Sequence, residues 1–200
     1  MTSKRILHSP KISLEGFLLV AAPHWESDIF RRAVCLIVHH DAEGAVGVLL
    51  NRSLKFDTQA LWTHLAGKNP ATLSTKSQPP TVHFGGPAAG PVVALHDQAE
   101  LAEFSGGNGV YFAAQIQHLQ QLLTSAGNSR MKIIVGQADW SAGQLDRDFW
   151  AGNWLPLPVT SNLVFCDGTE MWPRAMREIG NHYVATISGA HGQPGDLLSN

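Results

Sequence analysis

The sequence predicts a single domain in which β-strands form the framework and a few helices pack on them. Three observations predict this. The chain has 200 residues, 44% of them apolar, which is enough for one sizeable core. Short runs dense in Val, Ile, Leu and Phe recur along the chain and are bounded by turn residues. Between them lie a few stretches whose apolar residues repeat at helical spacing.

β-strands are the most numerous of the predicted elements. The predicted strands are residues 16–22, 33–40, 45–51, 81–85, 91–96, 131–137, 157–166 and 183–187. The second and third are separated by Asp41-Ala-Glu-Gly44, a composition suited to a type I turn that closes on a glycine with positive φ. We therefore expect these two strands to pair in antiparallel fashion.

Helices are predicted where apolar residues share one face: about 58–66, 110–125, 142–150 and 170–179. Four glycines stand where C-terminal caps belong, namely Gly67, Gly127, Gly152 and Gly180. The polar stretch from Gly67 to Pro80 is the best candidate for a mobile loop.

Charge and cysteine content limit the classes of function. The chain carries 14 Lys and Arg against 16 Asp and Glu, for a net charge of -2, so it lacks the basic surface on which nucleic-acid affinity normally rests. Cys35 and Cys166 lie in apolar runs, and we expect both to be reduced thiols in the cytoplasm. The apolar run 16–22 follows Glu15 and is too short for a signal peptide or a membrane span, so no membrane association is expected.

One stretch after the strongest strand has two interpretations. Ser141 and Gln144 have the spacing of a capping box, in which each side chain satisfies a backbone donor at the start of a helix. Alternatively, a strand that runs into a helix N-terminus beside Trp140 makes an anion-binding pocket.

A second stretch combines an in-strand glycine with an amide and a guanidinium. Gly47 removes a side chain where another backbone, an aromatic ring or a ligand comes close. Asn51 and Arg52 follow at the strand exit, and Arg52 could bind a carboxylate or phosphate in forked geometry. The alternative is that Asn51 starts a turn and Arg52 pairs with a nearby acid such as Asp57.

Histidines and glycines supply the remaining candidates. Gly85 and Gly86 let a backbone or a ligand approach closely. His39 and His40 are adjacent in a strand and so point to opposite faces. No zinc-binding spacing and no nucleophile elbow is present in the sequence, so we expect no metal and no cofactor.

Seven motifs in order resemble the YqgE/AlgH family of bacterial proteins. They are Gly16-Phe-Leu-Leu-Val-Ala-Ala-Pro23, Phe30-Arg-Arg-Ala-Val34, the stretch from His40 to Arg52, Gly85-Gly-Pro87, Trp140-Ser-Ala-Gly-Gln-Leu145, Asn153-Trp-Leu155 and the stretch from Met171 to Gly180. The resemblance covers about residues 16–180 of one domain, with 1–15 and 188–200 as tails. It implies an α+β fold whose mixed, split β-sheet folds into a pseudo-barrel flanked by about four helices.

The resemblance implies less about function. The family is mostly uncharacterised, with a label of transcriptional regulator taken from a member tied to the control of alginate production, and it brings no cofactor or catalytic set. Matching positions and the local patterns suggest a ligand-binding cleft in which Arg52 holds an anionic group. Its residues would be His40, Asn51, Arg52, Gly85, Gly86, Trp140 and Gln144.

Three classes of function remain open. The first, which we favour, is a regulatory module that binds a protein partner or a small anionic ligand. The second is direct DNA reading, which an acidic chain without a helix-turn-helix pattern supports poorly. The third is an enzyme with a constellation around His40, Arg52, His83 and Asp139, which requires that these side chains converge on one cleft.

Overall fold

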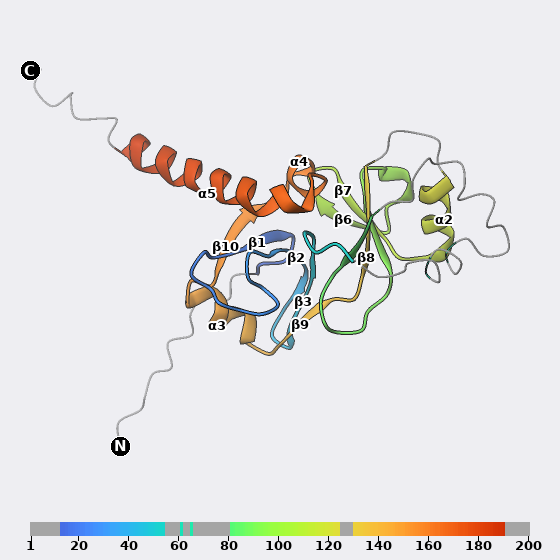
Figure 1. Ribbon diagram of the computed structural model, residues 1–200, viewed down its shortest axis with the longest axis horizontal. Helices are drawn as coiled ribbons and strands as arrows, with labels where there is room; N and C mark the ends of the chain where they lie inside the picture. The colour runs from blue at the N-terminus through green and yellow to red at the C-terminus, as the bar shows by residue number, and fades with distance from the viewer. Residues whose placement is uncertain (1–12, 55–60, 62–64, 66–80, 125–129, 191–200) are drawn as a thin grey trace, which may run out of the picture.

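Two five-stranded sheets form the framework of the protein (Figure 1). The structure, a computed structural model, describes residues 13–54, 61, 65, 81–124 and 130–190. The strands of sheet A come from separate parts of the chain, and all neighbouring strands in it are antiparallel. Its strand order is β10 (Trp154–Pro158), β1 (Phe17–Ala21), β2 (Val34–His40), β3 (Gly44–Leu49) and β9 (Ala138–Ser141).

Sheet B is built from one continuous stretch of the chain, inserted between β3 and β9 of sheet A. Its order is β4 (Val82–Phe84), β8 (Met131–Val135), β5 (Val93–His96), β7 (Val110–Ala113) and β6 (Phe104–Gly107). The β4–β8 pair is parallel and the other pairs are antiparallel.

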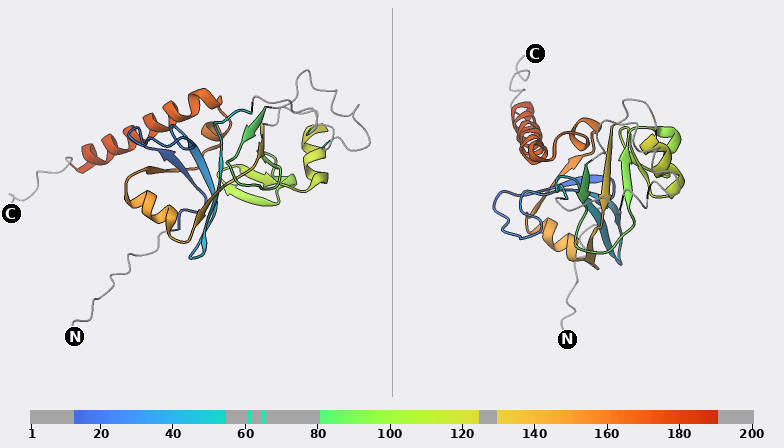
Figure 2. Two further views of the ribbon diagram at one scale, coloured as in Figure 1. Left: turned by 60° about the horizontal axis from the view of Figure 1, so that its bottom comes forward. Right: turned by 45° about the vertical axis from the view of Figure 1, so that its right-hand side comes forward.

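Four α-helices in the described part of the chain cover the sheets. α5 (Gly168–Ala190) runs along one face of sheet A, with the short α4 (Ser161–Val164) at its start, and α3 (Gln144–Trp150) lies on the opposite face (Figures 1 and 2). α2 (Ile116–Thr124) covers the outer face of sheet B, and a 3-10 turn spans Ala99–Leu101.

Successive side chains along the central strands point to opposite faces of sheet A, and this divides the core into layers. Leu18, Val20 and Leu36 belong to a cluster shared by sheet A, sheet B and α5. Leu19 and Cys35 point the other way, into a cluster under α3. Because both faces of sheet A are covered, its strands are apolar almost throughout, which is why the sequence shows them so clearly.

The predicted α+β class, with a mixed and split sheet flanked by four helices, is confirmed, and the two sheets do not close into a barrel among the described residues. The hairpin prediction is also confirmed: β2 and β3 pair antiparallel, and the Asp41 N–H donates to the Gly44 carbonyl at 3.0 Å. Gly44 has φ +153°, and a Cβ there would lie 2.4 Å from the Trp140 carbonyl oxygen. Gly152, with φ +77°, follows α3 as expected.

Three element predictions are wrong. The strand predicted at 157–166 ends at Pro158, because the Thr160 hydroxyl accepts from Leu163 N–H and starts α4. The strand predicted at 183–187 belongs to α5, which passes through Gly180 instead of ending there. The helix predicted from 110 begins at Ile116, since Val110–Ala113 pairs with β5 and β6.

Other predictions fall on residues outside the described part. They are the loop 67–80, the caps at Gly67 and Gly127, and most of the helix at 58–66, of which Leu61 and Leu65 are helical.

Candidate functional site

The two adjacent histidines lie in different environments, as their alternation predicts. The side chain of His40 is 6% exposed, accepts the Leu14 N–H at Nδ1 (3.1 Å), and places Nε2 3.6 Å from the Asp146 carboxylate. His39 is exposed and contacts Asp41 at 2.9 Å. His40 therefore ties the segment before β1 to α3.

Trp140 and Gln144 lie beside α3, and both are engaged within the fold. The Trp140 ring is 3% exposed and is stacked on Phe30 with centroids 5.5 Å apart. The Gln144 carboxamide accepts both the N–H and the hydroxyl of Ser141 at 3.1 Å. The capping box is only half formed, because the N-cap of α3 is Gly143 in left-handed conformation and Ser141 ends β9.

Asn51 and Arg52 join the exit of β3 to the loop before β2. The Asn51 side chain accepts the Val34 N–H at 3.0 Å and donates to the Arg32 carbonyl at 2.8 Å. The half-buried Arg52 guanidinium donates to the Arg31 carbonyl, and burial lowers its pKa. The acid suggested as its partner, Asp57, lies outside the described residues.

The glycines at 47, 85 and 86 give room to neighbouring parts of the same chain. A Cβ on Gly47 would lie 2.7 Å from Cys35 Sγ. A Cβ on Gly85 would lie 2.1 Å from the Gly136 carbonyl oxygen, and one on Gly86 2.3 Å from the Gln137 backbone. Gly47 thus permits close packing of β3 on β2, whereas Gly85 and Gly86 permit close approach to the crossover from sheet B to sheet A.

The seven residues of the predicted cleft therefore lie at three places. His40, Trp140 and Gln144 surround α3, Asn51 and Arg52 are at the β3 exit, and Gly85 and Gly86 face the crossover. Their ligand-binding role stays a prediction.

The four residues of the enzyme hypothesis contact different partners. These are Leu14 and Asp146 for His40, Arg31 for Arg52 and Gln137 for Asp139, whereas His83 is influenced electrostatically by the charges of Lys132 and Asp167. No hydrogen bond or ion pair joins any two of the four within the described ranges.

A buried polar cluster of His83, which the sequence singled out, and Lys132, which it did not, lies between sheet B and the start of α5. His83 is 3% exposed, and its Nδ1 has no hydrogen-bond partner. Burial, and then the nearby Lys132 ammonium, lower the pKa of His83 to about 4. Lys132 is 7% exposed and donates to the Cys166 carbonyl at 3.1 Å, and burial lowers its pKa too. The sequence signal was a lysine inside an otherwise apolar strand.

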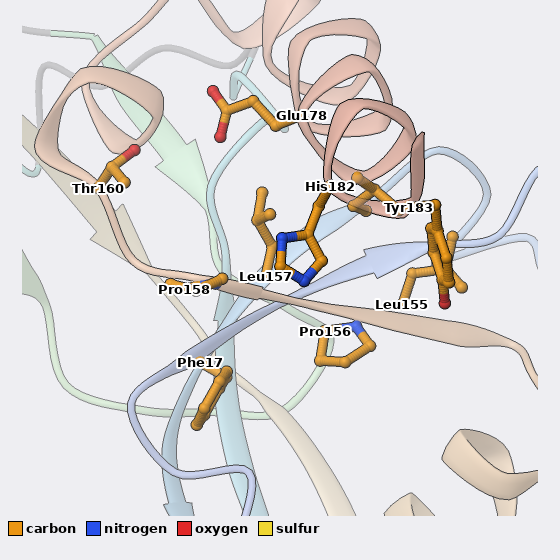
Figure 3. A pocket seen from close by; sticks show the side chains of 10 residues that line it. Phe17, Leu155, Pro156, Leu157, Pro158, Thr160, Glu178, His182 and Tyr183 are labelled. Atoms are coloured by element: carbon orange, nitrogen blue, oxygen red, sulfur yellow. The ribbon is translucent and has the colours of Figure 1, made fainter. Parts of the chain in front are cut away.

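An apolar groove lies between the edge strand β10 and α5. Its volume is about 670 Å³, within the range of ligand and peptide pockets. Figure 3 shows His182 and Tyr183 extending from α5 toward the strand. The lining is apolar except at Thr160, Glu178, His182 and the hydroxyl group of Tyr183.

The strand that borders the groove offers few backbone donors at its open edge. The bond from Ala22 N–H to the Asn153 carbonyl, 2.9 Å long, fixes which residues of β10 bond to β1, namely 155 and 157. The backbone groups of the alternate residues, Trp154, Pro156 and Pro158, therefore face outward. Because proline has no N–H, this edge presents three carbonyl acceptors and one donor.

The second half of α5 extends away from the body of the protein (Figure 1). Met171, Ala175 and Ile179 form a buried row at a spacing of four, but the next residue in that row, Tyr183, is 59% exposed. Val184 beside it is 64% exposed, and residues 179–190 include no Asp, Glu, Lys or Arg. The projecting half is therefore an uncharged helix with exposed apolar side chains.

Two further findings concern only the described ranges. None of their helices combines the length and the apolar character that a membrane crossing requires. No three His, Cys, Asp or Glu side chains gather there closely enough to hold a metal ion.

Comparison with known proteins gives consistent matches across nearly the whole chain. The model of a family described as AlgH-like matches residues 18–184. A UPF0301 protein from Xylella fastidiosa is 32% identical over 175 residues, covering 86% of this chain and 92% of the relative. A UPF0301 protein from Chlamydia caviae is 28% identical over 193 residues, covering 93% of this chain and 95% of the relative.

Solved structures share the fold. The solution structure of the AlgH protein from Pseudomonas aeruginosa matches with a TM-score of 0.64 at 21% identity, covering 98% of this chain and 100% of that one. A crystal structure from Corynebacterium diphtheriae matches with a TM-score of 0.65 at 24% identity, covering 84% of this chain and 88% of that one.

Proposed function

This chain belongs to the AlgH-like family, and we propose that it is a regulatory binding module rather than an enzyme or a direct reader of DNA. It acts by docking a helical segment of a protein partner in the groove between β10 and α5. A net charge of -2 and the separate partners of His40, Arg52, His83 and Asp139 support this choice over the two other classes.

The observation that carries the proposal is the groove itself. Its walls are apolar, and Phe17, Tyr183 and Val184, in or beside it, are 39%, 59% and 64% exposed. Contiguous apolar surface of this kind, rimmed by a few polar groups, is typical of sites that bind another molecule. Filling the groove removes these side chains from water, which is favourable by about 25 cal/mol per Å² of apolar surface.

The shape and polarity of the groove favour a helix over a strand as the occupant. A strand added to β10 would need N–H donors that Pro156 and Pro158 do not have. A helix satisfies its own backbone and can present an apolar face to the groove. Glu178 and the outward carbonyls of β10 are acceptors, so the occupant should carry a basic side chain beside its apolar face.

The test uses two synthetic amphipathic helical peptides with one apolar face, flanked by lysines in one and by glutamates in the other. Fluorescence anisotropy should show the lysine peptide binding at least about tenfold more tightly, and Glu178→Arg should reverse the preference. Leu155→Asp should abolish binding of both peptides, because it places a charge on the groove wall.

Trp150→Asp is the matched control, since Trp150 is 60% exposed on α3, on the opposite face of sheet A from α5, and does not line the groove. Binding unaffected by Leu155→Asp, or absent for both peptides with dilute parent protein, would contradict helix docking in this groove.

A further inference from the structure

We infer that a second copy of this chain is an occupant of the groove, so that two chains pair by placing the projecting halves of their α5 helices in each other's grooves. This inference rests on the proposed function, because it names the helix that the groove accepts.

The projecting half of α5 carries exposed apolar side chains of the kind that the groove accepts, and His182 at its start is the basic side chain beside them. It extends roughly 16 Å from residue 180 to residue 190 at 1.5 Å per residue. An isolated helix of this length is marginal in water, and helices in proteins are stabilised mainly by packing of an apolar face. Tyr183 and Val184 are exposed apolar side chains on that half, so a covering surface is missing in the single chain.

The charges on α5 allow two copies of the helix to complement each other. Residues 179–190 carry no Asp, Glu, Lys or Arg, so two such helices approach without repulsion between them. Glu178 and His182 both line the groove, one helical turn apart on α5. When two α5 helices lie antiparallel about a two-fold axis midway between these positions, the acid of each chain faces the histidine of the other.

The alternative route to self-association, through the open edge of β10, is closed. The edge of β10 beside the groove faces outward at Trp154, Pro156 and Pro158, and the prolines cannot donate to a second β10. A pair formed on this side must therefore be held by side-chain packing of helices, not by a sheet that continues from one copy to the next. A two-fold interface of this type is closed and stops at a dimer.

The experiment measures association of the full chain by sedimentation velocity over a wide range of concentrations. The parent chain should dimerise, and Tyr183→Glu or Val184→Glu should weaken the dimer at least about tenfold, since each charge is buried twice in a symmetric interface. Both positions are exposed and glutamate is a good helix former, so folding should persist, as circular dichroism would confirm. Trp150→Glu, at an equally exposed site on α3, should leave the dimer unchanged.

A mixing experiment tests the pairing of Glu178 with His182. Glu178→Lys alone places Lys opposite His, and His182→Glu alone places Glu opposite Glu, so each variant by itself should dimerise about tenfold more weakly. An equimolar mixture should recover the parent affinity, because in the mixed pair Lys faces Glu and His faces Glu. Rescue on mixing requires contact between chains, since each chain's internal contacts are unchanged by the mixture.

The outcomes separate this inference from the proposed function. A chain that stays monomeric at every concentration overturns the second copy, and binding of the lysine peptide by that monomer would leave helix docking standing. A dimer that is insensitive to Tyr183→Glu and Val184→Glu, or single variants that the mixture does not rescue, also overturns the inference.

Discussion

At the scale of single residues, the histidines show how burial decides chemistry. His40 and His83 both lie in strands and are both buried, yet only His40 has partners at both ring nitrogens. The Lys132 ammonium lies near His83. Burial of the His83 ring and this neighbouring charge both disfavour protonation of the ring.

His83 therefore makes stability depend on pH. Its pKa is about 4 in the folded protein against an ordinary value near 6.5, so the unfolded chain binds a proton first as the pH falls. The contribution of neutral His83 to the free energy of unfolding is fully present above about pH 6.5. It is lost progressively between about pH 6.5 and 4 and changes no further below that. At 1.36 kcal/mol per pKa unit the loss is at most about 3 kcal/mol.

Urea unfolding at a series of pH values checks this prediction. His83→Phe should flatten the fall in unfolding free energy across that window, whereas His24→Gln, which removes an exposed histidine, should not. An equal slope for parent and His83→Phe would show that this histidine titrates normally.

At the scale of elements, β10 shows a strand edge protected by its own sequence. Replacing both Pro156 and Pro158 by Val restores two N–H donors on the open edge. We expect the double variant to form species larger than those of the parent, increasing with concentration in light scattering coupled to gel filtration. Leu155→Val is the control, because the N–H of Leu155 already faces β1. An unchanged size distribution would mean that the prolines do not protect this edge.

The elements also show what could be predicted from sequence and why the rest could not. β1, β2 and β3 were predictable because both of their faces are buried and their runs are apolar. β6, with the sequence Phe-Ser-Gly-Gly, has no such run and is held in place by pairing with β7. The stretch 183–187 is β-rich in composition, but it continues a helix begun near Gly168, so context overrides local preference.

The candidate site was less predictable than the fold for the same reason. Gly85, Gly86 and Gly47 do mark close approaches, yet sequence alone cannot say that the approaching atoms are the protein's own. The groove depends on where α5 leaves sheet A, which is a property of packing between residues far apart in the chain. Its two visible signals were the prolines of β10 and the uncharged run 179–190.

At the scale of the whole molecule, one apolar cluster joins the two sheets. It includes Leu36 from sheet A, Ile134 from sheet B and Met171 from α5. The two sheets should therefore unfold together, because neither can lose its inner face without exposing the other's.

Gly85→Ala tests this cooperativity. The added Cβ would lie 2.1 Å from the Gly136 carbonyl oxygen, and we expect a loss of about 2–4 kcal/mol. In a Trp62→Phe background, tryptophan fluorescence reports on the five tryptophans in or beside sheet A, and circular dichroism reports on the whole chain. Both signals should shift to the same lower urea midpoint. Two separate midpoints would show that sheet B unfolds independently.

The insertion of sheet B between β3 and β9 also sets the order of events during synthesis. The ribosome makes β1, β2 and β3 first, but their partners β9 and β10 follow only after the whole of sheet B. Translation at about 5–20 residues per second leaves these apolar strands without their partners for roughly 5–20 s, the time in which the chain grows from Leu49 to Ala138. The N-terminal half should therefore be unable to fold alone.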